Sequence, residues 1–281
     1  MTPAPALDVA GRVAVVTGGA SGIGRATVLE LARRGAQVVA ADLHEDRLEE
    51  VRVAVEAMGA RILTVRCDVS LDAQVEHLRD EVLEEMGRVD LLMNNAGVVA
   101  LGPPETMTMA DWDWILQVNL YGVVRGVRAF LPHMLARGSG HVVNTASLAG
   151  LFAYAWDSIP YITGKFAVAG FTEALALYAN PLGVGVTLVC PGLVDTNLGE
   201  TARFPGIDDP GRWLQTIALP DPVAPEAVAT RVCDAVAAGR FLVTTADDLV
   251  RARVRERAED HDAFVAAMVE RLPTPPNLHR P

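Results

Sequence analysis

The chain has almost no lysine. Of its 24 cationic side chains, 23 are arginine, and Lys165 is the single lysine. Arginine and lysine differ most where a compact ammonium with a shiftable pKa must touch one specific group. We therefore infer that position 165 is one at which a guanidinium would not serve.

Positive charge is scarce overall, and long apolar runs are absent. The 281 residues carry a formal net charge of −11, and no basic patch stands out. Nucleic acids and anionic membranes bind through clustered Lys and Arg, so neither is an expected partner. No apolar run reaches the ~18 residues that a membrane-spanning helix needs. The N-terminus has no basic segment, so we expect no signal peptide.

Cysteine is also rare. Cys67, Cys190 and Cys233 lie far apart, form no CxxC pair, and each joins or follows an apolar run. This pattern favours buried free thiols in a reducing cytoplasm. No metal site is expected.

Short apolar runs alternate with amphipathic stretches along most of the chain. The runs are continuous rather than alternating, which indicates strands buried on both faces of a parallel sheet. Right-handed crossovers then predict an α/β fold, a doubly wound Rossmann-type sheet with helices on both faces. The expected strands are 12–16, 37–42, 61–67, 89–93, 141–147, 184–190 and 241–244. The expected helices are 25–34, 43–58, 72–86, 109–137 with Thr108 as its N-cap, 158–180, 225–238 and 247–272.

We expect one domain over residues 1–281. About 11–192 would form the nucleotide-binding and catalytic core, about 196–221 a substrate-binding segment, and about 273–281 a loose tail. Ligands of such sheets bind beyond the carboxyl ends of the strands. Polar or glycine-rich residues follow six of the expected strands at that edge, namely 18–24, Asp42, Asp68, 94–97, Ser147 and 191–192.

A glycine turn links the first expected strand and helix. Gly18, Gly22 and Gly24 would let backbone N–H groups approach a pyrophosphate at the helix N-terminus. A plain tight turn is the alternative. Asp42 follows Gly24 by 18 residues, near the ~20-residue offset at which an acid binds ribose hydroxyls. An acid there repels a 2′-phosphate, so NAD is favoured over NADP, with a helix cap as the alternative. Asp68 could likewise cap a helix or meet the adenine amino group.

Tyr161 and Lys165 are four residues apart in an expected helix. This spacing places both on one face, about 5–6 Å apart at Cβ. A free tyrosine titrates near ~10, and moving it to ~7 takes about 4 kcal/mol. One ammonium at ~4 Å and an effective dielectric of ~20 supplies about that much. The pair therefore predicts an acid/base tyrosine tuned by its neighbour. The alternative is a half-buried core tyrosine beside a solvated lysine.

Together these residues resemble the short-chain dehydrogenase/reductase family over roughly residues 11–196. The resemblance implies that Tyr161 is the general acid/base, that Lys165 lowers its pKa and holds the nicotinamide ribose, and that Ser147 hydrogen-bonds the substrate oxygen. Asn119 would help to hold a proton-relay water. A homo-oligomer, tetramer or dimer, would form through the helices at 109–137 and 158–180. The cofactor-binding residues implied by the motifs and the resemblance are Gly18, Ser21, Gly22, Ile23, Gly24, Asp42, Asp68, Val69, Asn94, Asn95, Ala96, Gly97, Tyr161, Lys165, Pro191, Gly192, Val194 and Thr196.

The sequence departs from the family pattern at two places. Ser147 and Tyr161 are 14 positions apart, about one more than is usual, so the loop 148–160 is expected to be reshaped. Gly164 stands where a serine is common, which we interpret as close packing. The expected pocket walls are Ser147, Leu148, Phe152, Tyr154, Trp156, Leu198, Phe204 and Trp213.

These walls are mostly apolar, and the cations near them in the sequence are Arg203 and Arg212. A hydrophobic secondary alcohol or ketone is the expected substrate class. Two other functions stay open. One is a dinucleotide-sensing regulatory protein without catalysis. The other is an epimerase or dehydratase of the same fold that retains NAD, although these usually have longer C-terminal substrate domains than the 85 residues that follow Thr196.

Overall fold

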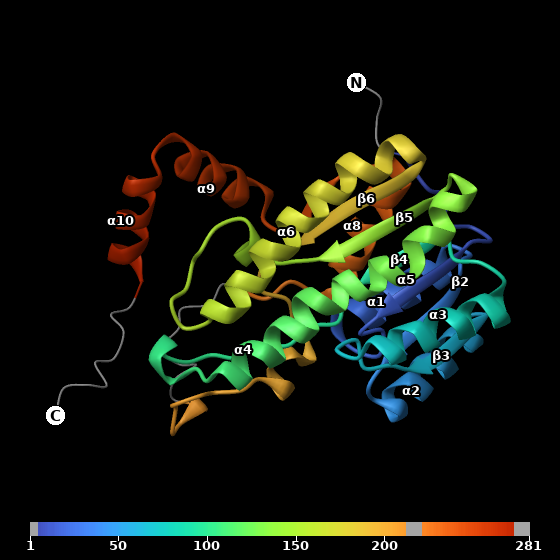
Figure 1. Cartoon of the computed structure of the whole chain (residues 1–281), viewed down its shortest axis with the longest axis horizontal. Helices are drawn as coiled ribbons and strands as arrows, with labels where there is room; N and C mark the ends of the chain where they lie inside the picture. The colour runs from blue at the N-terminus through green and yellow to red at the C-terminus, as the bar shows by residue number, and fades with distance from the viewer. Residues whose placement is uncertain (1–4, 212–220, 273–281) are drawn as a thin grey trace.

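The computed structural model describes residues 5–211 and 221–272. Within these residues a parallel seven-stranded sheet has the order β3-β2-β1-β4-β5-β6-β7 (Figure 1). This confirms the predicted fold class. The strands are β1 (Val13–Thr17), β2 (Gln37–Asp42), β3 (Ile62–Arg66), β4 (Leu91–Asn94), β5 (Gly140–Thr145), β6 (Val184–Cys190) and β7 (Leu242–Thr244).

Helices cover both faces of the sheet (Figure 1). One face carries α1 (Gly22–Arg33), α2 (Glu45–Ala57) and α8 (Pro225–Ala238). The other face carries α3 (Asp72–Met86), α5 (Gly122–Arg137) and α6 (Ile159–Ala179). The two layers explain why the strands are continuously apolar, because neighbouring residues of one strand enter opposite cores.

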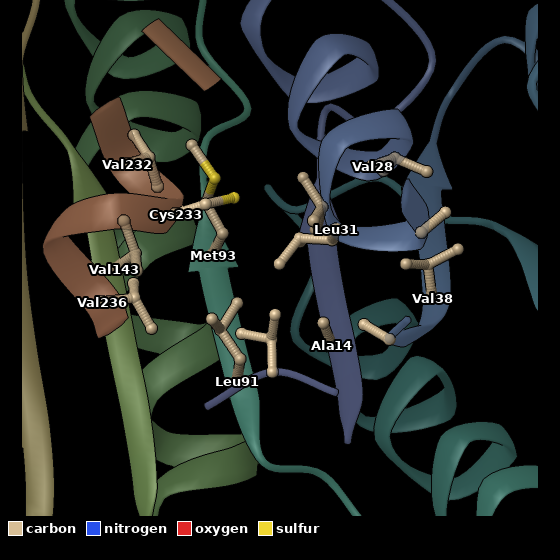
Figure 2. Packing of buried hydrophobic residues seen from close by; sticks show 14 of the residues in the cluster. Ala14, Val28, Leu31, Val38, Leu91, Met93, Val143, Val232, Cys233 and Val236 are labelled. Atoms are coloured by element: carbon tan, nitrogen blue, oxygen red, sulfur yellow. The ribbon is translucent and has the colours of Figure 1, made fainter. Parts of the chain in front are cut away.

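Strand β1 illustrates this division. Ala14 and Val16 lie in the core beneath α1 and α8, and Val13 and Val15 lie in the core beneath α3 and α5. Figure 2 shows the first core, where α1 and α8 contribute side chains that face β1, β2, β4 and β5. Each buried valine contributes about 1.5–3 kcal/mol relative to an exposed one.

The predicted long helix over residues 109–137 is present, but it is not regular throughout. The segment consists of α4 (Met109–Leu116), a π-helical turn η2 (Gln117–Tyr121) and α5. Thr108 begins α4 with a capping box to Asp111, as predicted. The π-turn places Asn119 where both atoms of its side-chain amide bond the backbone of Val98. Such turns inside helices are frequent at functional sites.

The expectation of one helix over residues 247–272 is wrong. Two helices, α9 (Asp247–Glu259) and α10 (His261–Arg271), meet at Asp260, which ends the first and N-caps the second through a bond from the Ala263 N–H at 2.9 Å. Phe264 of α10 packs edge-on against Phe152, with ring centroids 6.5 Å apart. The C-terminal helices therefore contact the loop that follows Ser147. No described helix is long and apolar enough to span a membrane.

The boundaries of the other helices agree with the sequence to within a few residues. Three expectations lie outside the described residues: Arg212, Trp213 and the tail at 273–281. The cysteines at 67, 190 and 233 are buried free thiols, as predicted.

Candidate active site

The glycine turn after β1 is built without room for side chains. Gly18 and Gly22 have φ of 63° and 48°, the left-handed region that favours glycine. A Cβ at Gly24 would stand 1.9 Å from the carbonyl oxygen of Gly18. Ser21 begins α1 without a side-chain cap, and the first turn carries no acid. The N–H groups at this helix end are therefore suited to an anion, and Ile23, beside them, packs partly into the core below.

Asp42 ties the end of β2 to this turn. Its Oδ2 accepts from the Ala20 N–H at 3.1 Å, and its Oδ1 accepts from the His44 N–H at 3.2 Å. The carboxyl is 10% exposed. It does not cap α2, whose N-cap is His44. Asp42 therefore holds a negative charge beside the glycine turn, where the motif spacing places a ribose-binding acid.

The loop after β3 uses its polar group internally. Asp68 Oδ1 accepts from the Ser70 N–H at 2.9 Å and does not cap α3, whose N-cap is Leu71. Val69 is buried, and its side chain would be 2.9 Å from a Cβ at Gly122. Asp68 therefore closes a tight turn, and Val69 packs against the start of α5.

The two asparagines at the end of β4 also bond other groups of the protein. Asn94 Nδ2 donates to Asn144 Oδ1 at 2.9 Å, and Asn95 Nδ2 donates to the Thr17 and Gly18 carbonyls at 3.3 and 3.4 Å. The Ala96 N–H donates to Thr17 Oγ1 at 3.3 Å. The sequence motifs predict these residues at the cofactor site. In the structure the side-chain amide of Asn95 bonds the start of the glycine turn, whereas that of Asn94 joins β4 to β5.

Lys165 reaches the carboxyl end of β5 from α6. Its Nζ donates to the Thr145 carbonyl at 3.0 Å and lies 5.5 Å from the centroid of the Tyr161 ring. The residue is only 4% exposed, and burial lowers the pKa of its ammonium to about 8. A Cβ at Gly97 would stand 3.7 Å from this Nζ and 3.3 Å from Asn119 Oδ1, so the glycine keeps the space beside the lysine open.

Tyr161 and Ser147 face each other across the site. The hydroxyl of Ser147, just beyond β5, accepts from the Ala149 N–H at 3.2 Å. Burial raises the pKa of Tyr161 above its ordinary value, and the nearby Ser147 hydroxyl opposes that rise only in part. Lys165 was expected to lower the pKa of Tyr161, but in the protein alone that pKa is raised. The Lys165 ammonium is itself desolvated and donates to the Thr145 carbonyl. Burial therefore has the larger effect on the pKa of the phenol.

The segment after β6 lies over the glycine turn. Thr196 Cγ2 would be 2.8 Å from a Cβ at Gly22, and the Gly192 N–H donates to Thr245 Oγ1 at 2.8 Å. The Pro191 carbonyl accepts from the Leu148 N–H at 2.9 Å. Val194 forms a parallel bridge with Val223. These bonds place the segment between the nucleotide side and the Ser147 side of the site.

The expected pocket walls divide into two groups. Leu148 and Phe152 are buried in a cluster with Val250 and Phe264 of the C-terminal helices. Trp156, Leu198 and Phe204 are half-buried in the loops around the site. The loops are joined at their backbones, since the Gly102 N–H donates to the Asp157 carbonyl and the Leu101 N–H to the Arg203 carbonyl.

Arg203, a candidate anchor for an anionic substrate, is engaged elsewhere. Its guanidinium stacks 3.8 Å from the centroid of the Trp114 ring and lies 3.7 Å from the Asp111 carboxylate. One contact had no counterpart in the sequence analysis, namely the bond from Lys165 to the Thr145 carbonyl. It has no spacing signal, because its acceptor is a backbone group.

Comparison with known proteins identifies the family. Residues 12–204 match the family model described as short chain dehydrogenase. A crystal structure of a short chain dehydrogenase/reductase from Burkholderia phymatum in complex with NAD is 36% identical, with a TM-score of 0.83 over 96% of this chain and 99% of that one. The 3beta-hydroxysteroid dehydrogenase 2 of Eggerthella lenta is 37% identical over 199 residues, 70% of this chain and 76% of that protein. The D-threitol dehydrogenase of Mycolicibacterium smegmatis is 37% identical over 221 residues, 78% and 85% of the two chains. The chain therefore belongs to the short-chain dehydrogenase/reductase family of oxidoreductases.

Proposed function

We propose that this enzyme transfers a hydride between NAD and the carbinol carbon of an apolar secondary alcohol, and that it runs the reverse reaction on the ketone. The observation that carries the proposal is the meeting of Ser147, Tyr161 and Lys165 at the carboxyl edge of the sheet. A hydroxyl donor, a titratable phenol and a buried ammonium are the groups that alcohol oxidation requires of a protein.

The residues at the first two strand ends fit a dinucleotide. The uncapped start of α1 and the turn at Gly18, Gly22 and Gly24 would hold the pyrophosphate. Asp42 would bind the ribose hydroxyls and repel a 2′-phosphate, so the preferred cofactor is NAD. Bound NAD supplies the acceptor for the hydride. Lys165 would bind the nicotinamide ribose.

The protein's own part in the chemistry is to hold the oxygen and move one proton. In oxidation the substrate hydroxyl proton passes to the Tyr161 phenolate as the hydride leaves the carbon, and Ser147 donates to the oxygen. In reduction the neutral phenol donates the proton. Because burial raises the pKa of Tyr161, the protein alone holds the neutral, proton-donating form at pH 7. Oxidation should therefore speed up as the pH rises, and reduction should not need alkaline conditions.

The pocket lining favours an uncharged substrate. Trp156 and Phe204, both half-buried, bring apolar surface to the loops around Ser147. Leu148 and Phe152 lie behind them in the cluster with Val250 and Phe264. Arg203 is already paired with Asp111, so within the described loops it offers little to a carboxylate or phosphate. The steroid dehydrogenase relative supports a cyclic, apolar substrate, whereas the equally similar threitol dehydrogenase shows that identity alone does not choose between apolar and polar alcohols.

We also propose a homo-oligomer that assembles through α5 and α6. Leu177 of α6 is 78% exposed and Tyr121, at the start of α5, is 47% exposed. Apolar side chains this exposed at helices of one face favour contact with a second copy. Light scattering coupled to size-exclusion chromatography would show a dimer or tetramer; a monomer at micromolar concentration would contradict this assembly.

The test of the proposed activity is a spectrophotometric screen. Purified enzyme is mixed with NAD or NADP and a panel of cyclic, acyclic and polyhydroxylated secondary alcohols, and NADH formation is followed by absorbance. We expect turnover with NAD and an apolar member of the panel. Turnover only with NADP would contradict the role of Asp42, and turnover only with polyols would contradict the substrate class.

A further inference from the structure

An ion pair joins two segments that lie 153 positions apart in the sequence. Arg47, in the first turn of α2, donates from Nη2 to Glu200 Oε2 at 2.6 Å. Glu200 belongs to η5 (Asn197–Thr201), a 3₁₀ turn that follows Thr196. Its other carboxylate oxygen accepts from Asn197 Nδ2. Both oxygens of Glu200 are therefore engaged, and its side chain is held in the geometry that meets Arg47.

The two partners belong to segments that each border the proposed dinucleotide site. Helix α2 follows directly after Asp42, whose carboxylate bonds the glycine turn. Thr196, just before η5, lies over the same turn, with its Cγ2 2.8 Å from the position of a Cβ at Gly22. The pair of Arg47 and Glu200 therefore completes a ring of contacts around the place proposed for the pyrophosphate and the ribose.

The segment that carries Glu200 is fixed at its two ends and weakly held between them. Before η5, the Asp195 N–H donates to the Val223 carbonyl at 3.1 Å, and after it the Arg203 N–H donates to the Val99 carbonyl at 3.1 Å. The turn η5 itself, which lies wholly in the described part of the chain, has no buried residue. Segments with few buried contacts open at a low cost in free energy, so an ion pair on the surface is enough to change how often this segment leaves the glycine turn.

We propose that Arg47 and Glu200 form a latch, which holds residues 194–201 over the bound dinucleotide and slows its release. The inference rests on the proposed dinucleotide site, because the latch has a use only if the cofactor lies beneath this segment. The cofactor leaves after the segment moves away from the glycine turn, and that movement separates the two charges. The pair therefore controls the exchange of cofactor rather than the hydride step, and in many enzymes such a release step limits turnover.

The alternative is that Arg47 attracts the anionic cofactor directly and that Glu200 only weakens this attraction. The two explanations differ in sign at Glu200. Removing a carboxylate near a bound anion strengthens binding through charge alone, so under the alternative Glu200→Gln slows release. Under the latch the same substitution speeds release, because it removes the charge that holds the segment closed while it keeps the size of the side chain.

Stopped-flow fluorescence measures release without any turnover. Enzyme loaded with NADH is mixed with excess NAD, and the loss of bound-NADH fluorescence gives the rate constant of release. We expect release to be roughly two- to fivefold faster in Arg47→Gln and in Glu200→Gln, the range typical for the loss of one exposed ion pair. Arg52→Gln is the matched control and should leave the rate unchanged. Arg52 lies on the same helix, its side chain is 37% exposed against 33% for Arg47, and its ion pairs stay within α2.

A double-mutant cycle tests whether the two residues act as a pair. If they form a latch, the second Gln substitution adds nothing to the first, and the double variant releases NADH as fast as either single variant. Slower or unchanged release in Glu200→Gln, or fully additive effects, would overturn the latch and leave the proposed function standing. A wild type that binds NADPH and not NADH would contradict the proposed cofactor, and the release of NADPH would then test the latch in the same way. A wild type that binds neither would overturn both.

Discussion

Replacing Lys165 with methionine tests how the buried ammonium affects the free energy of unfolding. The side chain is 4% exposed and donates to the Thr145 carbonyl at 3.0 Å. Burial lowers its pKa from the ordinary 10.5 to about 8. Methionine is unbranched and of similar length, so it fills the same space without the charge.

The pKa shift sets the size of the effect on stability. The difference between 10.5 and about 8, at ~1.36 kcal/mol per pKa unit, is an energetic cost of about 3 kcal/mol for keeping the ammonium charged inside the protein. Loss of the donor to Thr145 costs about 1–2 kcal/mol in return. We therefore expect Lys165→Met to raise the free energy of unfolding at pH 7 by about 1–2 kcal/mol, while turnover is lost.

The pH dependence distinguishes this explanation from simple packing. The folded pKa of Lys165 lies below the unfolded one, so both states hold the proton below about pH 8 and the cost is present in full. As the pH rises from 8 toward 10.5, the folded state releases its proton first and the wild type gains stability relative to the variant. Urea unfolding of both proteins at pH 7.0 and 9.5 should show the variant more stable at 7.0 and its advantage lost at 9.5. A variant that is less stable at pH 7.0, or a difference independent of pH, would refute the reasoning.

Two further predictions concern cofactor choice and acid stability. Asp42→Asn keeps an acceptor for the Ala20 N–H and removes the charge, so discrimination of NAD over NADP, measured as the ratio of kcat/KM values, should fall by roughly 10–100-fold, or about 1.4–2.7 kcal/mol; an unchanged ratio would remove Asp42 from the explanation of cofactor choice. Burial lowers the pKa of His141 to about 4, below its ordinary 6.5, so the folded state binds this proton less readily and stability should decline as the pH falls from 6.5 to 4, by at most about 3 kcal/mol. His141→Gln should lose less stability over that range in urea unfolding, and an equal loss in both proteins would contradict the assignment.

The fold was predictable because strands that are buried on both faces have a recognisable apolar pattern in the sequence. Every residue of β1 and β6 is buried, and a fully buried strand is a continuous apolar run. The interruption at Asn119 was not predictable, since the apolar pattern continues through Val118 and Leu120 while the backbone adds a π-turn. The helix break at Asp260 was not predictable either, because one more acidic residue in a charged segment is typical of a solvated helix face.

The proximity of Tyr161 and Lys165 was predictable from their spacing, whereas the electrostatics and hydrogen bonds of the candidate site were not. Spacing on a helix brings Lys165 near Tyr161, but it carries no information about desolvation, which raises the pKa of the phenol in the protein alone. The spacing also does not indicate which groups a side-chain amide hydrogen-bonds. Asn95, expected at the cofactor, donates to the glycine turn.

The most direct test of the proposed function follows the hydride itself. A secondary alcohol on which the enzyme is active is prepared with deuterium on the carbinol carbon and incubated with NAD, and the NADH is analysed by mass spectrometry. We expect one deuterium in each NADH formed by the wild type, and no product from Tyr161→Phe although that variant still binds NAD. Unlabelled NADH from the wild type, or full turnover by Tyr161→Phe, would contradict hydride transfer with Tyr161 as the acid/base.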